Sequence, residues 1–113
     1  MTDGTPVIAA QRVDSGDSAD LSEITELARA AGYEVVATLA QSRTEDAAYH
    51  FGEGKVEALA GLVAETGAAA VVVDNRLGPY QTYNIGGTLP TGVEVIDRFT
   101  LILEIFGQRA NTR

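Results

Sequence analysis

The turn at Gly52, Gly54 and Lys55 has residue types that can hold a phosphate group. Glycines let backbone N–H groups approach an anion at the beginning of a helix, and a lysine adds positive charge. A Walker A loop is excluded because it would need glycine at Tyr49 and a hydroxyl residue at Val56, and a dinucleotide fingerprint lacks its third glycine. The turn therefore predicts an anion or RNA-phosphate contact, with a tight turn and a solvated lysine as the alternative.

Two arginines, Arg43 and Arg76, are further candidates for contact with phosphate or RNA. Arg43 lies in a polar loop before the glycine turn, and Arg76 follows Asp74 at the end of an apolar run. The carboxyl ends of parallel strands are where open α/β folds bind ligands. A metal or phosphoryl-acceptor role for Asp74 would need a second cluster of carboxylates, and the first strand offers none at its end. We therefore expect a capping or turn role for Asp74 and no metal site.

The histidine and two tyrosines have structural explanations beside functional ones. We expect His50 to be a turn residue or a partly buried side chain, and we predict no catalytic residue because no nucleophilic arrangement can be assembled around it. Tyr80 and Tyr83 are three residues apart on a predicted helix. They could stack on bases, but packing on the sheet is the commoner use of that spacing.

Strands and helices must alternate along the chain to position these residues. Short apolar or β-branched runs predict strands at 6–10, 34–41, 69–74 and 92–96. Apolar residues at helical spacing predict helices after a cap at Ser18, Asp20 or Ser22, after the glycine turn to about 66, over 77–89, and from 97 onwards. The pair Gly86 and Gly87 indicates that the third helix is short or frayed. Because helices separate the strands, we predict an α/β fold, a four-stranded, mostly parallel sheet with helices on both faces.

Composition limits the class of protein. The chain has 113 residues, a net charge of −8 and no cysteine. It fits a single domain over 1–113, and its charge argues against a general nucleic-acid surface unless the arginines cluster. Scarce lysine and abundant acid would also suit a salt-rich cytoplasm, which we treat as a hypothesis about the source. No secretion signal is visible and the longest apolar run, 68–73, is too short to span a bilayer, so we expect a cytoplasmic protein without a membrane span.

The last stretch reads as a strand entering a helix that has no stop signal. Asp97 is placed as the N-cap of this helix, with Arg98 in its first turn. Gly107 is followed by residues that continue the helix, and no capping signal closes the pattern after Arg113. We therefore predict a truncated C-terminal helix and a chain that is part of a larger protein, in which Arg98, Arg109 and Arg113 could face a neighbouring domain.

Three stretches, 49–59, 77–84 and 95–112, resemble the N-terminal domain of HflX-type GTPases in order and spacing. The resemblance covers about 27 to 113. It implies the N-terminal α/β subdomain of a larger GTPase, with the helical hairpin and the GTPase domain absent. It also implies that Asp97, Arg98 and Arg109 lie at an inter-domain hinge. The family has an arginine where this chain has Tyr83.

The resemblance further implies a role in translation. HflX-type proteins bind the large ribosomal subunit, so the implied partners are rRNA, through the parent protein, and the parent's own hairpin and GTPase domain. The implied contribution is ribosome contact and modulation of the GTPase domain. GTP and Mg²⁺ are expected for the parent and no cofactor for this chain, which has no P-loop and no guanine-recognition motif. An oligomer formed by the chain alone need not be native.

Two other interpretations remain open. The domain could bind ATP or GTP at the carboxyl ends of its strands and act as a regulatory nucleotide-binding domain. It could instead be a structural domain that packs on the GTPase domain and controls its access. An apolar exposed face on the last helix would favour the latter.

Overall fold

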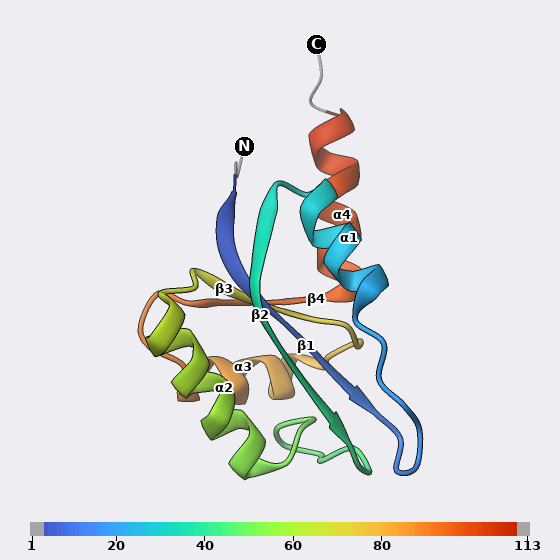
Figure 1. The fold of residues 1–113 in the computed structure, drawn as a ribbon, viewed down its shortest axis with the longest axis vertical. Helices are drawn as coiled ribbons and strands as arrows, with labels where there is room; N and C mark the ends of the chain where they lie inside the picture. Colours follow the sequence, from blue (N-terminus) through green and yellow to red (C-terminus); the bar gives the residue numbers. More distant parts are fainter. Residues whose placement is uncertain (1–3, 111–113) are drawn as a thin grey trace.

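Strands and helices alternate along residues 4–110, the part of the chain that the computed structural model describes (Figure 1). The strands are β1 (Thr5–Val13), β2 (Tyr33–Ser42), β3 (Ala70–Val73) and β4 (Glu94–Asp97). The helices are α1 (Ser22–Ala30), α2 (Glu53–Thr66), α3 (Pro79–Thr88) and α4 (Arg98–Ala110). The strand order is β2-β1-β3-β4 and every pairing is parallel, which confirms the predicted α/β fold.

Two helices cover each face of the sheet, as Figure 1 shows. Successive side chains of a strand point to opposite faces, so each strand contributes to two cores. On one face Ile8 and Val71 pack with residues of α2 and α3, and on the other face Val7 and Val72 pack with residues of α1 and α4. All four residues of β3 are buried, as expected for a central parallel strand.

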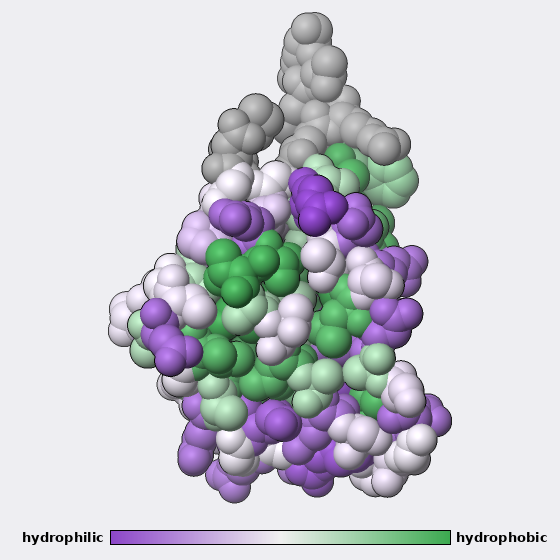
Figure 2. Space-filling model, viewed as in Figure 1, coloured by the Kyte–Doolittle hydropathy of each residue, from purple (hydrophilic) through white to green (hydrophobic). Residues whose placement is uncertain are grey.

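The first strand is longer than its apolar run predicts. β1 continues to Val13 because it stays paired with β2 as far as Ser42. A β-bulge interrupts this pairing, since Val7 lies opposite Val35 and Ile8 lies opposite Ala37, which leaves Val36 unpaired and exposed. Figure 2 shows apolar residues gathered between α1 and α2 on this face, with hydrophilic residues around them.

The third helix is shorter than the predicted 77–89, but it does not fray at its two glycines. α3 includes Gly86 and Gly87 and ends at Thr88, whose hydroxyl donates a hydrogen bond to the Asn84 carbonyl at 3.2 Å. Ile85 is fully buried against the sheet. Tertiary packing of this side chain therefore outweighs the low helix propensity of the two glycines.

The last helix packs one apolar side against the sheet, and further apolar residues on it are exposed. α4 passes through Gly107 as predicted, and Leu101 is buried on the side that meets the sheet. Phe99, Leu103 and Phe106 follow one another at helical spacing and are 54%, 52% and 61% exposed. We call these three residues the α4 stripe. No helix within 4–110 is both long enough and apolar enough to cross a bilayer.

Candidate functional site

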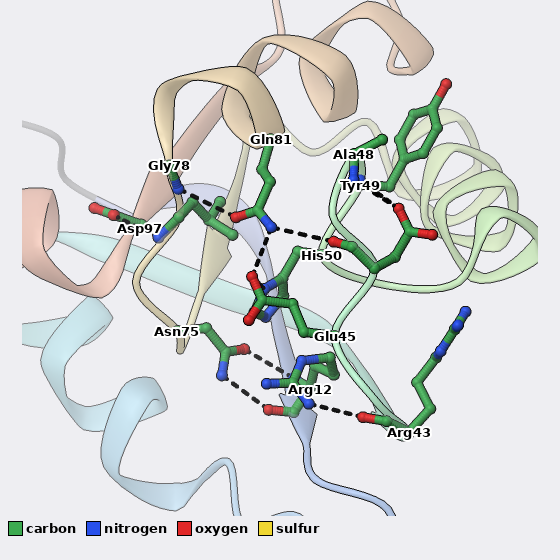
Figure 3. A network of polar contacts seen from close by, with 12 residues as sticks. Arg12, Arg43, Glu45, Ala48, Tyr49, His50, Asn75, Gly78, Gln81 and Asp97 are labelled. Carbon is green, nitrogen blue, oxygen red and sulfur yellow. Dashed lines mark hydrogen bonds and ion pairs between the residues drawn. The ribbon is translucent and has the colours of Figure 1, made fainter.

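The carboxyl edge of the sheet contains the point at which the strand order reverses. From β1 the chain crosses to β2 on one side and later to β3 on the other, so the ends of β1 and β3 form the position where open α/β folds bind ligands. Asn75 bridges the two strand ends (Figure 3). Its Oδ1 accepts from the Arg12 backbone N–H at 2.8 Å, and its Nδ2 donates to the Arg12 carbonyl at 2.8 Å. The side chain thus extends the sheet by one pair of hydrogen bonds.

The Arg12 side chain is buried at this strand end. Its Nη1 donates to the backbone carbonyl of Arg43 at 2.7 Å and pairs with Asp14 Oδ1 at 3.1 Å. Arg12 Nε is also buried and has no hydrogen-bond partner among the described residues. The guanidinium therefore fixes the loop after β2 to the end of β1.

His50 is buried beside this arginine in the loop between β2 and α2 (Figure 3). Its φ of 69° is left-handed, and its ring meets Phe51 edge to face with centroids 5.1 Å apart. Within 4–110 neither ring nitrogen has a hydrogen-bond partner, and Nδ1 lies 3.6 Å from Glu45 Oε2. Burial lowers the pKa of His50, so the ring is neutral at pH 7. The expected turn or buried role is confirmed.

Gln81 ties α3 to the same loop. Its Nε2 donates to Glu45 Oε2 at 2.7 Å and to the Asp46 carbonyl at 3.1 Å, and its Oε1 accepts from the Gly78 N–H at 3.1 Å (Figure 3). The hydrogen bond from Gln81 holds the pKa of Glu45 below its usual value. Sequence reasoning assigned no role to Gln81 or Arg12. The signal for Gln81 was its helical spacing from buried Ile85, which places a polar group on the apolar face of α3.

The reversal point is therefore occupied by side chains of this chain. Arg12, His50 and Gln81 are all buried there, and Asn75 fills the gap between the strand ends. Their hydrogen bonds fix three loops relative to one another. This arrangement stabilises the edge of the sheet. A phosphate site would therefore have to lie beside this position and not in it.

Four of the five predicted phosphate or RNA contacts meet at the amino end of α2. Gly52 precedes the helix, and Gly54 and Lys55 stand in its first turn. The Arg43 guanidinium lies against Gly52, because a Cβ built there would be 2.5 Å from Arg43 Nη1. A residue that sequence reasoning missed, Gln41, accepts the Gly52 N–H at 2.9 Å. A side chain at this position would displace the arginine from the start of the helix.

Charge at this amino end is mixed. The first turn contains Glu53 as well as Lys55. The early N–H groups of a helix lack intrahelical partners and favour an anion. The fifth candidate, Arg76, belongs to another surface: it follows β3 and its guanidinium lies over the Phe99 ring, 5.5 Å from the centroid.

Asp74 lies in the bend that follows β3, as a turn role predicts, but its carboxylate bonds to side chains and not to the N–H groups of a helix. Its backbone N–H continues the sheet by bonding to the Ala10 carbonyl at 2.7 Å. Its buried carboxylate accepts from Arg98 Nη1 at 2.8 Å and from Gln11 Nε2 at 2.7 Å. Arg98 Nη2 also pairs with Glu23 Oε2 at 3.2 Å. Asp74 therefore joins β3 to the beginning of α4.

The other hinge candidates lie on the same helix. Asp97 Oδ1 accepts from the Thr100 N–H at 2.9 Å, which confirms the predicted cap, and its Oδ2 accepts from the Leu77 N–H at 3.1 Å. Although burial opposes the shift, these two N–H groups lower the pKa of Asp97. Arg109 belongs to the last turn of α4, and Arg113 lies outside the described residues.

The expectation that Tyr80 and Tyr83 pack on the sheet is wrong. Both side chains project from α3 and are 67% and 79% exposed. Among the residues at 4–110, no group of three His, Cys, Asp or Glu side chains is arranged as a metal site requires.

The family and the individual proteins that match this chain agree with one another. Residues 18–107 match a family described as "GTP-binding GTPase N-terminal". A protein named "GTPase HflX" from Thermofilum pendens is 48% identical over 95% of this chain and 25% of its own length. "GTPase HflX" from Thermococcus kodakarensis is 45% identical over 81% of this chain and 20% of its own. The protein of that name from Escherichia coli is 40% identical over 85% and 22%.

Solved structures agree with the fold. The crystal structure of SsGBP with GDP superposes with a TM-score of 0.71 at 22% identity, over 94% of this chain and 30% of that one. A GTP-binding protein of Sulfolobus solfataricus in complex with GDP gives a TM-score of 0.64 at 22% identity, over 88% and 30%. The chain thus spans about a quarter of the length of the HflX relatives, of which 25%, 20% and 22% are covered.

Proposed function

The chain belongs to the HflX family of GTPases, and from this premise we propose that it is the N-terminal accessory domain of a larger GTPase, which it modulates by packing on the rest of that protein. The observation that carries the proposal is the α4 stripe. Phe99, Leu103 and Phe106 expose more than half of their surface on one face of the last helix. Large apolar side chains grouped in this way mark interaction surfaces.

The position of the α4 stripe supports coupling to a neighbouring domain. Arg98 anchors the beginning of α4 to Asp74 and Glu23, and Asp97 caps it. These contacts connect the beginning of the helix that carries the stripe to the carboxyl edge of the sheet. This arrangement suits a domain that senses the state of its neighbour.

A second proposed role is contact with the large ribosomal subunit through the amino end of α2. The Arg43 guanidinium lies against Gly52 there, and Lys55 stands in the first turn of the helix. Two cations and a helix amino end can hold a phosphate of rRNA. Glu53 weakens the field of this group, so we expect a local contact and not an extended one.

The interpretation as a nucleotide-binding domain is less well supported. Nucleotides in open α/β folds bind where the strand order reverses, and here Arg12, His50 and Asn75 fill that position. The glycine turn also lacks residues that a Walker A loop needs. GTP and Mg²⁺ would therefore be bound by other parts of the full-length protein.

The test uses the full-length protein that contains this chain. Phe106→Ser should change its rate of GTP hydrolysis severalfold, because a polar residue in the α4 stripe weakens domain packing. Lys55→Glu should weaken co-sedimentation with large ribosomal subunits, because it reverses a charge beside the proposed phosphate. Both residues are at least partly exposed, so neither change should lower the melting temperature of the 113-residue chain.

Two variants serve as controls. Val36→Ser alters an exposed apolar residue on β2, and Glu65→Lys reverses a charge at the far end of α2. Neither should affect hydrolysis or sedimentation. Unchanged hydrolysis by the Phe106 variant would remove the packing proposal, and unchanged sedimentation by the Lys55 variant would remove the α2 contact.

A further inference from the structure

The side chains of the two exposed tyrosines of α3 are not part of the hydrophobic core. Tyr80 and Tyr83 are three residues apart, so they lie on neighbouring positions of one helix face. They expose 67% and 79% of their surface. The sequence suggested two uses for this pair, packing on the sheet or stacking on bases, and this exposure rules out the first.

Tyr83 stands between two hollows of the surface. On one side a groove of about 570 Å³ lies between α3 and the beginning of α4, with Arg76, Val95 and Phe99 in its wall. On the other side a hollow of about 530 Å³ runs along α3 past Gly86 and Gly87 to Tyr49. Tyr83 and Thr82 line both. Both hollows are open to solvent. The exposed Tyr83 side chain therefore borders both hollows.

The charge in the groove favours a ligand with few phosphates. Arg76 is a cation at its wall. Asp97 also lines the groove and interacts electrostatically with Arg76, so the groove contains one charge of each sign. The molecule as a whole carries −8 and repels an extended polyanion. A partner must therefore bind mainly through its flat faces.

We propose that Tyr80 and Tyr83 form a stacking surface for unpaired bases of a single-stranded RNA segment, with Arg76 meeting one phosphate. Bases in a duplex are stacked on one another and present no free face, whereas unpaired bases stack readily on aromatic side chains. The inference rests on the proposed RNA contact of this domain, but it names a different surface from the amino end of α2. It can therefore be tested independently of the contact at Lys55.

Binding of a labelled oligoadenylate of eight nucleotides to the 113-residue chain tests the proposal by fluorescence anisotropy. Tyr80→Ala combined with Tyr83→Ala should weaken binding by about tenfold or more, and Tyr83→Phe should retain it, because the ring and not the hydroxyl stacks. Between 0.1 and 0.5 M KCl the affinity should fall by no more than about threefold, as expected when a single phosphate is neutralised.

Val36→Ala is the control, because it removes an exposed apolar side chain from β2 and should leave binding unchanged. A melting curve of each variant verifies folding. No saturable binding by the wild-type chain would overturn the proposal and leave protein contact as the use of the tyrosines. Binding that is lost with Lys55→Glu but kept by the tyrosine variants would also overturn it, while supporting the α2 contact. Tyrosine-dependent binding together with normal sedimentation of the Lys55 variant would support the stacking surface alone.

Discussion

His50 combines a left-handed backbone with a buried ring that lacks hydrogen bonds within the described residues. Non-glycine residues rarely adopt this conformation, and a buried polar ring without partners is costly. The fold tolerates both because the loop is fixed by Gln81, which bonds to Glu45 and Asp46, and by Arg12, which bonds to Arg43. His50 is therefore the residue at which the stability of this loop should respond to pH.

We predict that the free energy of unfolding falls as the pH is lowered from 7.5 to 5.5. Burial lowers the pKa of His50 below 6.5, its value when unfolded, so the unfolded chain binds a proton that the folded chain does not. Stability is complete above pH 6.5 and is lost below it, at up to about 1.4 kcal/mol per pH unit for one proton. Glu45 faces the ring on its own loop and Arg12 faces it from β1. Urea denaturation at several pH values measures the effect.

His50→Asn is the control for this prediction, because asparagine accepts the left-handed conformation and does not titrate. Its stability should be nearly constant over the same pH range. The carboxyl groups with lowered pKa, Asp20, Glu45, Asp46 and Asp97, lose their contribution only at more acidic pH, since stability from such a group is present above its unfolded pKa. An equal slope in both proteins would assign the effect to groups other than His50.

Sequence reasoning found the glycine turn and Arg43 as separate candidates, and the structure places them together. Residue types and loop position were sufficient for that, because both segments flank the same helix start. Arg12 and Asn75 could not be paired from the sequence. Their contact depends on the register between β1 and β3, which no local pattern encodes.

At the scale of elements, α4 is attached to the sheet by charge at its first residue. Arg98 joins Asp74 at the end of β3 and Glu23 on α1, so one side chain links three elements. The side chain of Asp74 is only 7% exposed, whereas that of Glu23 is 68% exposed. The contact with Asp74 should therefore contribute more, because it is screened less by solvent.

Arg98→Ala should lower the free energy of unfolding by about 1–3 kcal/mol, because it leaves a buried carboxylate with Gln11 as its remaining side-chain donor. Hydrogen exchange in the first turns of α4 should also become faster. Urea denaturation and exchange followed by mass spectrometry measure the two effects. Arg29→Ala breaks an exposed pair on α1 and should cost about 0.5 kcal/mol or less. A similar loss of stability in both variants would mean that the contact of Arg98 with Asp74 contributes no more than an exposed ion pair.

The elements themselves were largely predictable, and their limits were not. Apolar runs in the sequence, such as 70–73, predict strands directly. The end of β1 depends on pairing with β2, and the length of α3 depends on the burial of Ile85, so both require tertiary contacts. The exposure of Tyr80 and Tyr83 likewise depends on how α3 is rotated on the sheet, which the spacing of two residues does not determine.

At the scale of the whole molecule, the net charge of −8 opposes compaction. We predict that the melting temperature rises when KCl is increased from 0.15 M to 2 M, because the screening length shrinks from about 8 Å to less than 3 Å. This is the outcome expected for a protein adapted to a salt-rich cytoplasm. Thermal melting followed by circular dichroism measures it.

A variant with fewer charges tests the cause of that rise. Glu34, Glu57 and Glu65 are exposed, and their replacement by glutamine reduces the negative charge without disturbing the core. The triple variant should gain less from salt than the natural chain. If the melting temperature of the natural chain did not rise with salt, or rose equally in both proteins, the acidic composition would not be an adaptation to salt.

The bulge at Val36 has a consequence for how copies of this chain behave in a crowded solution. β2 is one of the two outer strands of the sheet and has ten residues, and apolar side chains are gathered beside it (Figure 2). A straight strand of that length would offer its free backbone groups to an identical strand, which is how ordered aggregates grow. The unpaired residue is the fourth of the ten and interrupts the regular row of backbone groups. A single additional residue thus helps to keep the protein dispersed.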